Sequence, residues 1–132
     1  MADGAAALDA HIARIRQLPG LVKRAAPEVR DVLERELRLT IAAGRSPSGV
    51  AWKPRADGSQ ALQNAASALA VTVVGTVVIA RLTGVEVRHH LGAVKGGIRR
   101  QILPSGGIPA PVSKGIHVAL TREFRRTMGA GA

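Results

Sequence analysis

The stretch that decides the fold is Leu69-Ala-Val-Thr-Val-Val-Gly75-Thr76-Val-Val-Ile-Ala-Arg-Leu82. Two runs rich in valine, isoleucine and threonine flank a central Gly-Thr pair. β-branched residues favour strands, and a glycine in the first place of a two-residue connection is typical of a tight hairpin turn. The sequence therefore predicts two antiparallel strands joined at Gly75-Thr76.

The same region also fits a membrane span, because residues 61–80 carry no charged side chain. A helix of about 20 apolar residues is long enough to cross a bilayer. The polar side chains of Gln63, Asn64 and Thr72 weaken that interpretation, as does the high β-branched content. We favour the hairpin and keep a membrane-inserted protein as one alternative.

Helices are predicted on the N-terminal side of the hairpin. Residues 9–18 place apolar side chains at helical spacing before Pro19-Gly20. A second helix begins with Pro27 in its first turn and ends near Gly44. Its apolar stripe consists of Val29, Val32, Leu33, Leu37 and Ile41.

The part of the chain after the hairpin alternates short elements with glycine- and proline-rich loops. Residues 85–92 are expected to be irregular or briefly helical, and residues 98–103 to form a further strand closed by Pro104. A last amphipathic helix is expected to be capped by Ser113 and ended by Gly129.

These elements predict a single α+β domain over residues 1–132, because the chain is too short for two independent cores. Its parts are N-terminal helices (1–44), a loop (45–60), a β-rich part with a small antiparallel sheet and long loops (61–112), and a C-terminal helix (113–129). The core is poor in aromatic side chains, with one Trp, one Phe and no Tyr. Small side chains bury little area, at about 25 cal/mol per Å², so we expect contacts between subunits to contribute to stability.

The single tryptophan, Trp52, lies in the Gly/Pro/Ser-rich loop 45–60. Large aromatic side chains usually bury most of their area. We therefore interpret Trp52 as an anchor that fixes the loop to the core; an exposed contact with a partner is the alternative.

The net charge is +10, and it is uneven. Residues 1–45 hold eight Lys/Arg and six Asp/Glu, whereas residues 46–132 hold eleven and three. Such an excess favours polyanions or acidic partners over a neutral surface. The candidate residues for contact with phosphate groups or with an acidic partner are Lys95, Arg99, Arg100, Arg122, Arg125 and Arg126. We expect that neutralising the first three together leaves the subunit folded.

No pattern typical of a catalytic, metal or cofactor site is present. The chain has no cysteine, no Gly-x-Ser-x-Gly motif and no phosphate-binding loop with a Gly-Lys-Ser/Thr ending. His89 and His90 are adjacent and project in different directions, and Glu86 is one of only three acidic residues after residue 45. We predict a protein that is not an enzyme and holds no metal or cofactor, with a packing role for the histidine pair.

The N-terminus lacks the basic and apolar regions of a signal peptide. Synthesis in the cytoplasm is therefore expected.

Five segments occur in an order that resembles the virion-morphogenesis and tail-completion (neck) proteins of tailed bacteriophages. They are Gly49-Val-Ala-Trp52-Lys-Pro54, the hairpin, His89-His90-Leu91-Gly92, Arg99-Arg100-Gln101-Ile102-Leu103-Pro104 and the final helix. The resemblance covers about residues 45–128.

The resemblance implies an α+β subunit of a virion ring, six-fold, in the neck between head and tail. Its partners would be copies of itself, the connector or head-closure protein, and the tail tube or tail terminator protein. Such a ring surrounds the DNA channel, where contact with duplex DNA would be sequence-independent. The alternative is a small basic protein that binds nucleic acid without reading its sequence.

Overall fold

The structure is a computed structural model that describes residues 2–94 and 96–129 of the chain. Its elements in chain order are α1 (Ala2–Gln17), η1 (Leu18–Gly20), α2 (Leu21–Ala42), η2 (Ala65–Ala68), β1 (Leu69–Val74), β2 (Val77–Leu82), α3 (Glu86–Leu91) and α4 (Ala110–Met128). The two strands form one antiparallel sheet. The predicted α+β class is confirmed.

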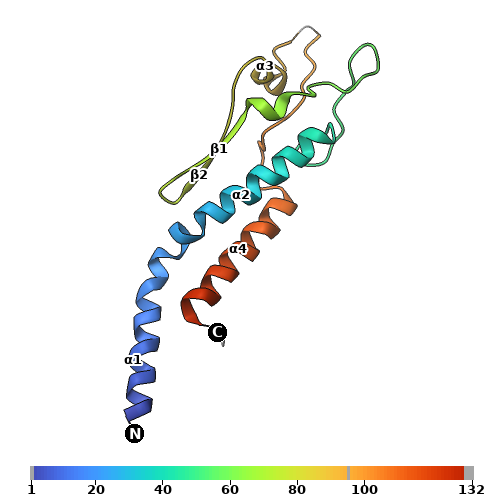
Figure 1. Ribbon diagram of the computed structural model, residues 1–132. Coiled ribbons are helices and arrows are strands. Elements are labelled where there is room, and N and C mark those ends of the chain that lie inside the picture. The colour runs from blue at the N-terminus through green and yellow to red at the C-terminus, as the bar shows by residue number, and fades with distance from the viewer. Residues whose placement is uncertain (1, 95, 130–132) are drawn as a thin grey trace.

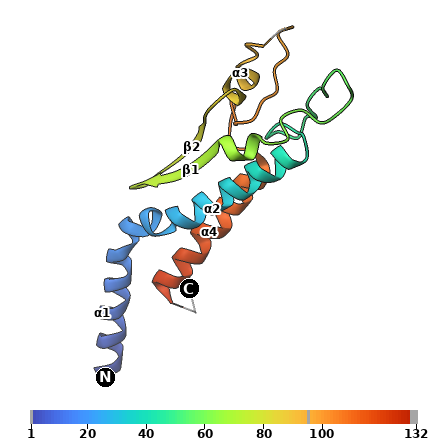
Figure 2. The same cartoon turned by 45° about the horizontal axis from the view of Figure 1, so that its top comes forward.

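The molecule is elongated and is organised around α2 (Figures 1 and 2). The hairpin packs on one side of α2 and α4 packs along another. The short helix α3 and the long loops gather beyond the end of α2, whereas α1 extends away from the opposite end (Figure 2). The N-terminal helix therefore stands largely apart from the body.

The hairpin has the predicted strands and the predicted turn. Pairing runs from Leu69 opposite Leu82 to Val74 opposite Val77. Gly75 has a φ of 63°, whereas the φ of Thr76 is not positive. A positive φ at the first turn residue alone is the pattern of a type II′ turn, which matches the twist of the strands. Among the described residues, no helix combines the length and the apolar character needed to cross a bilayer.

All three long helices start earlier than the sequence suggested, and α1 begins at Ala2 and not at residue 9. The helix α2 begins at Leu21, so Pro27 lies inside it and not in its first turn. Proline has no N–H, so the helical hydrogen bond to the carbonyl of Lys23 is missing. Both residues are exposed, and water can donate a hydrogen bond to that carbonyl instead. The end of α2 at Ala42 agrees with the prediction, and Gly44 follows with a φ of 67°.

The helix α4 begins at Ala110, and Ser113 is not its cap. The Ser113 N–H donates to the carbonyl of Pro109 at 2.9 Å, as an ordinary helical residue does. Pro111 lies in the first turn, where no backbone N–H is required. The prediction at the other end is confirmed, since Gly129 caps the helix with a φ of 95°.

The packing of α4 on α2 depends on one glycine and one buried carboxylate. A Cβ atom on Gly115 would lie 2.4 Å from Cγ1 of Val32, so only glycine permits this close approach. Further along α4, the buried Glu123 accepts hydrogen bonds from Arg24 at 3.1 Å and from Arg126 at 2.5 Å. These contacts fix the two helices against each other near the end of the molecule from which α1 extends.

The core lies where α2 meets the hairpin and the loops. Its buried cluster contains Leu37, Ile41, Trp52, Ala65, Leu69, Val71 and Ile102. The residues 98–103, predicted as a strand, contribute Ile102 to this core but form no strand. The backbone N–H groups of Arg100 and Ile102 instead donate to His89 and His90 of α3. A neighbouring helix therefore takes the place that a partner strand would fill.

Candidate assembly and polyanion interface

Trp52 ties the 45–60 loop to the core. Its indole Nε1–H donates to the carbonyl of Gln101 at 2.8 Å, and its backbone N–H donates to the carbonyl of Gly44 at 2.8 Å. The side chain is 9% exposed and packs in the core cluster. This is the placement expected of a loop anchor and not of an exposed partner contact.

Arg100 is buried, which corrects its prediction as a surface cation. It is 6% exposed, and its guanidinium donates to the carbonyls of Lys53 at 2.8 Å and Pro54 at 3.3 Å. The same group lies 3.1 Å from Nδ1 of His89. In an extended segment, residues 100 and 102 share one face, and Ile102 is fully buried, so Arg100 is carried inward with it.

The two histidines hold the 99–103 segment against α3. Nδ1 of His90 accepts from the backbone N–H groups of Ile102 at 3.1 Å and Leu103 at 3.4 Å, so that nitrogen carries no proton. Burial, and then the charge of Arg99, lowers the pKa of His90. Burial, and then the charge of Arg100, lowers the pKa of His89, with Glu86 acting in the opposite direction. The pair is therefore neutral in the folded protein at neutral pH.

The free energy of unfolding should fall on acidification because of these histidines. Their folded-state pKa values lie below the unfolded-state value of about 6.5, so below that pH the unfolded chain binds more protons. The histidine contribution is fully present above about pH 6.5 and is lost as the pH falls through the folded-state pKa values. Urea unfolding at a series of pH values measures it.

A variant with His89→Asn and His90→Asn should show a flatter profile over that interval. The matched control carries His11→Asn and His117→Asn, because both of those histidines are exposed. If the control flattens the profile and the His89/His90 variant does not, the assignment to α3 is wrong.

Two of the predicted cations are engaged in ion pairs between or along helices. Arg122 on α4 pairs with Glu28 on α2, and Arg126 pairs with Glu123 one turn away. Both arginines keep part of their side chain in solvent, but their charge is compensated. The Arg122 pair joins α4 to α2, whereas the Arg126 pair lies within α4.

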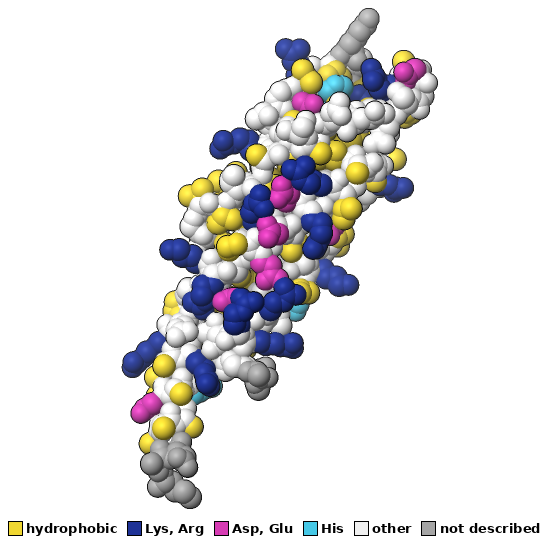
Figure 3. All heavy atoms as spheres, viewed as in Figure 1, with side chains coloured by type: hydrophobic (Ala, Val, Ile, Leu, Met, Phe, Trp, Pro, Cys, Tyr) yellow, Lys and Arg dark blue, Asp and Glu magenta, His cyan; other side chains and the backbone are white. Residues whose placement is uncertain are grey.

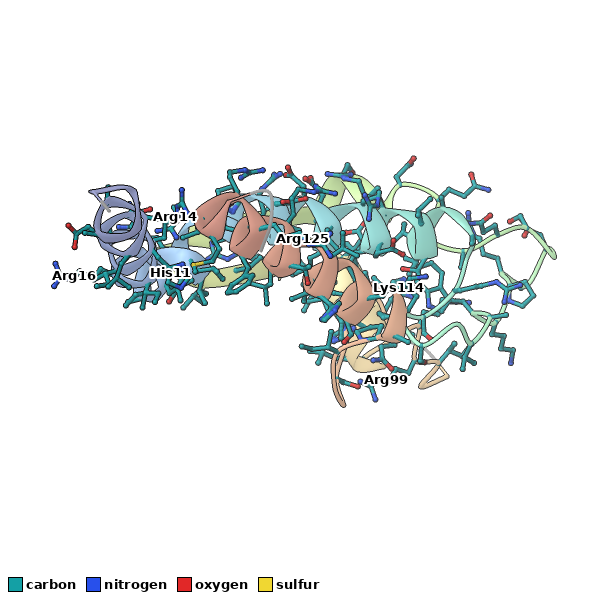
Figure 4. The ribbon with its side chains drawn as sticks, turned by 90° about the horizontal axis from the view of Figure 1, so that it is seen from below. His11, Arg14, Arg16, Arg99, Lys114 and Arg125 are labelled. Atoms are coloured by element: carbon teal, nitrogen blue, oxygen red, sulfur yellow. The ribbon has the colours of Figure 1, made fainter. Side chains whose placement is uncertain are left out.

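The cations without an acidic partner among the described residues are distributed along the molecule. Figure 4 labels five of them: Arg14 and Arg16 on α1, Lys114 and Arg125 on α4, and Arg99 beside α3. All five side chains are exposed. Arg99 donates to the carbonyl of His90 at 2.9 Å and remains exposed. Lys95 lies outside the described residues.

The space-filling view shows how these charges are distributed (Figure 3). Several acidic side chains on this face lie in a central line over the body, with Lys and Arg around them and along the edges of the molecule. The line follows α2, where Arg30 and Arg38 pair with Glu34, and Arg35 with Glu36. The net positive charge is therefore carried mainly by cations outside this paired network.

The exposure of α1 is the feature that the sequence did not predict. Every side chain described on it, from residue 4 to residue 17, is exposed, including Leu8, Ile12 and Ile15. The helical spacing was visible in the sequence, but periodicity does not show whether an apolar stripe is covered by its own chain. Among the described residues, no group of three or more His, Asp or Glu side chains is placed to hold a metal ion.

No known protein family, curated protein or solved structure matches this chain.

Proposed function

We propose that this protein is a structural subunit of a tailed-phage virion, a tail-completion or neck protein. It assembles with copies of itself into a ring, six-fold by the family resemblance, that joins the head connector to the tail. The ring surrounds the channel through which the genome passes.

The observation that carries the proposal is the exposure of α1. Most of the stability of a helix in a protein comes from the packing of its apolar face, and Leu8, Ile12 and Ile15 are uncovered in the single chain. A subunit that completes its packing with a neighbour fits this feature better than a self-sufficient monomer.

The segments that carry the family resemblance also contact one another, which supports reading them together. Trp52 donates a hydrogen bond to the carbonyl of Gln101, and the guanidinium of Arg100 donates to the carbonyls of residues 53 and 54. His90 accepts hydrogen bonds from the backbone N–H groups of residues 102 and 103. Three separate stretches thus specify one local structure.

The cations without an ion-pair partner are suited to weak, sequence-independent contact with DNA. Arg125 and Lys114 on α4 are exposed and form no ion pair with a described residue, although Lys114 lines the same groove as Asp31 and Glu36. Phosphate attraction of this kind is independent of sequence and weakens with salt. Such a surface suits a channel wall along which DNA moves.

The test is association with phage particles. The protein should co-purify with intact virions, and phage unable to make it should accumulate separate heads and tails. Supplying the unmodified chain in trans should restore joined particles. Purified infectious virions that lack the protein would rule out the proposal.

A second candidate, a sequence-independent nucleic-acid-binding protein, is favoured by the same exposed cations. It predicts duplex binding by the purified chain that falls steeply with salt. Arg125→Gln should reduce the salt slope by about 1, whereas Arg122→Gln, which removes an ion-paired arginine, should reduce it less. Salt-dependent duplex binding by a protein absent from particles would favour this candidate.

A further inference from the structure

The structure contains two uncovered apolar surfaces of different shape. The first is the stripe of α1 formed by Leu8, Ile12 and Ile15, which are 59%, 37% and 45% exposed. Spacings of four and three residues place these side chains on one face of the helix. The stripe is convex and, as Figures 1 and 2 show, lies on a helix that points away from the body.

The second surface is a groove of about 360 Å³ on the body. Its walls include Val29 and Leu33 of α2, Val78 and Ala80 of β2, Ile116 of α4 and Ile108 of the preceding loop. All eleven lining residues are apolar or glycine. By contrast, the groove between α2 and α4 that contains Glu28, Asp31 and Arg35 is lined with charges.

The stripe of one chain does not reach the groove of the same chain. The last turns of α1 lie beside the C-terminal end of α4, where Arg14 is next to Gly129. The groove lies at the other end of α4, around Ile116, about 20 Å away along the helix. From its contact with the C-terminal end of α4, α1 extends away from the body (Figure 2).

We infer that the apolar stripe of α1 in one copy lies in the apolar groove of the next copy. An uncharged stripe then meets an uncharged groove, in the manner of an amphipathic helix in a hydrophobic groove. The contact joins different surfaces of two copies, and a series of such contacts closes into a ring when the rotation between copies allows it. The inference rests on the proposed function at one point only, which is that the series of contacts closes into a ring.

The area of one contact is small, and a closed ring doubles it for each subunit. A 16-residue helix is about 24 Å long and about 10 Å wide, so covering half of its surface buries about 400 Å² of the helix and about 800 Å² over both partners. A specific interface buries at least about 1,000 Å², and the two contacts that every subunit of a closed ring makes together exceed that area. Pairing of two α1 helices would cover only the stripe and leave the groove open.

Cysteine cross-linking tests the contact directly, because the chain has no cysteine of its own. Ile12→Cys marks the stripe and Ile108→Cys marks the groove; both positions are exposed in the single chain. On oxidation, an equal mixture of the two variants should give a disulfide-linked dimer, and a chain with both changes should give a ladder of multimers. Leu39→Cys, exposed on α2 outside the groove, replaces Ile108→Cys in the control mixture and should give no dimer.

Two results would overturn the inference. One is the absence of cross-links in the stripe–groove mixture under conditions in which the double variant is folded by circular dichroism. The other is efficient dimerisation of Ile12→Cys alone, which would show that α1 pairs with itself.

Charge variants give an independent measurement of the same contact. Ile12→Glu and Ile108→Glu should each weaken self-association at least about tenfold in analytical ultracentrifugation, whereas Leu39→Glu should leave it unchanged. Combining Ile12→Glu with Ile108→Arg should restore part of the loss. An unmodified chain that stays monomeric up to millimolar concentration would contradict the inference.

These outcomes separate the inference from the proposed function. A cross-linked ladder from a protein absent from virions would leave the contact in place and remove the phage assignment. Particle association without stripe–groove cross-links would do the reverse.

Discussion

Trp52→Ala should lower the free energy of unfolding by about 3–5 kcal/mol, which is the usual cost of truncating a large buried aromatic side chain. The indole is almost fully buried against Leu37, Ile41 and Ile102. Its loss leaves a cavity and an unpaired carbonyl on Gln101. It also releases the 45–60 loop from the segment that contains Arg100. Urea unfolding monitored by circular dichroism measures the change, since the variant has no tryptophan fluorescence.

Trp52→Phe separates packing from hydrogen bonding at this position. The ring fills most of the same space, but the bond to Gln101 is lost, so a smaller decrease of about 1–2 kcal/mol is expected. Self-association should follow folding in both variants. A Trp52→Ala protein with unchanged stability and assembly would refute the anchor role.

Arg100→Ala should lower the free energy of unfolding by about 3 kcal/mol, because it leaves the carbonyls of Lys53 and Pro54 without their donors. Arg100→Lys should restore little of the loss, since an ammonium group cannot reach both carbonyls and His89 as a planar guanidinium does. Neutralising Lys95, Arg99 and Arg100 together should therefore unfold the subunit or destabilise it strongly. This reverses the expectation from the sequence.

The matched control is the neighbouring arginine. Arg99→Ala removes the same charge from an exposed side chain and should change stability by no more than about 0.5 kcal/mol. Equal losses for Arg99→Ala and Arg100→Ala would mean that net charge, and not the buried hydrogen bonds, explains both.

Local signals in the sequence were sufficient for the hairpin and for the ends of the helices. A β-branched run on each side of Gly75-Thr76 leaves few alternatives, because the turn needs a positive φ that glycine adopts without strain. Glycines at 44 and 129 ended their helices for the same reason. The starts of the helices were misplaced because Pro27 and Ser113 are acceptable in more than one position of a helix.

The features that sequence reasoning did not predict depend on contacts between distant residues. The segment 98–103 has the composition of a strand, but no strand lies beside it in the described part of the chain, and Nδ1 of His90 accepts from the N–H groups of residues 102 and 103. The adjacent arginines at 99 and 100 look equivalent in the sequence, yet one is exposed and the other buried. Only the burial of Ile102, two residues on, distinguishes them, and that burial is set by the core.

The pairing of α2 with α4 has a consequence for how the chain folds. Residues 43–109 separate the two helices, and the contact between Arg24 and Glu123 spans 99 positions. At about 5–20 residues per second, a ribosome takes several seconds to deliver α4 after α2 is complete. During that interval the apolar side of α2 has no partner helix, so the nascent chain exposes apolar surface that is prone to aggregation. Contacts between helices that are far apart in the sequence also form slowly in the purified chain. Its refolding should therefore be slower than that of a helical bundle with short connections.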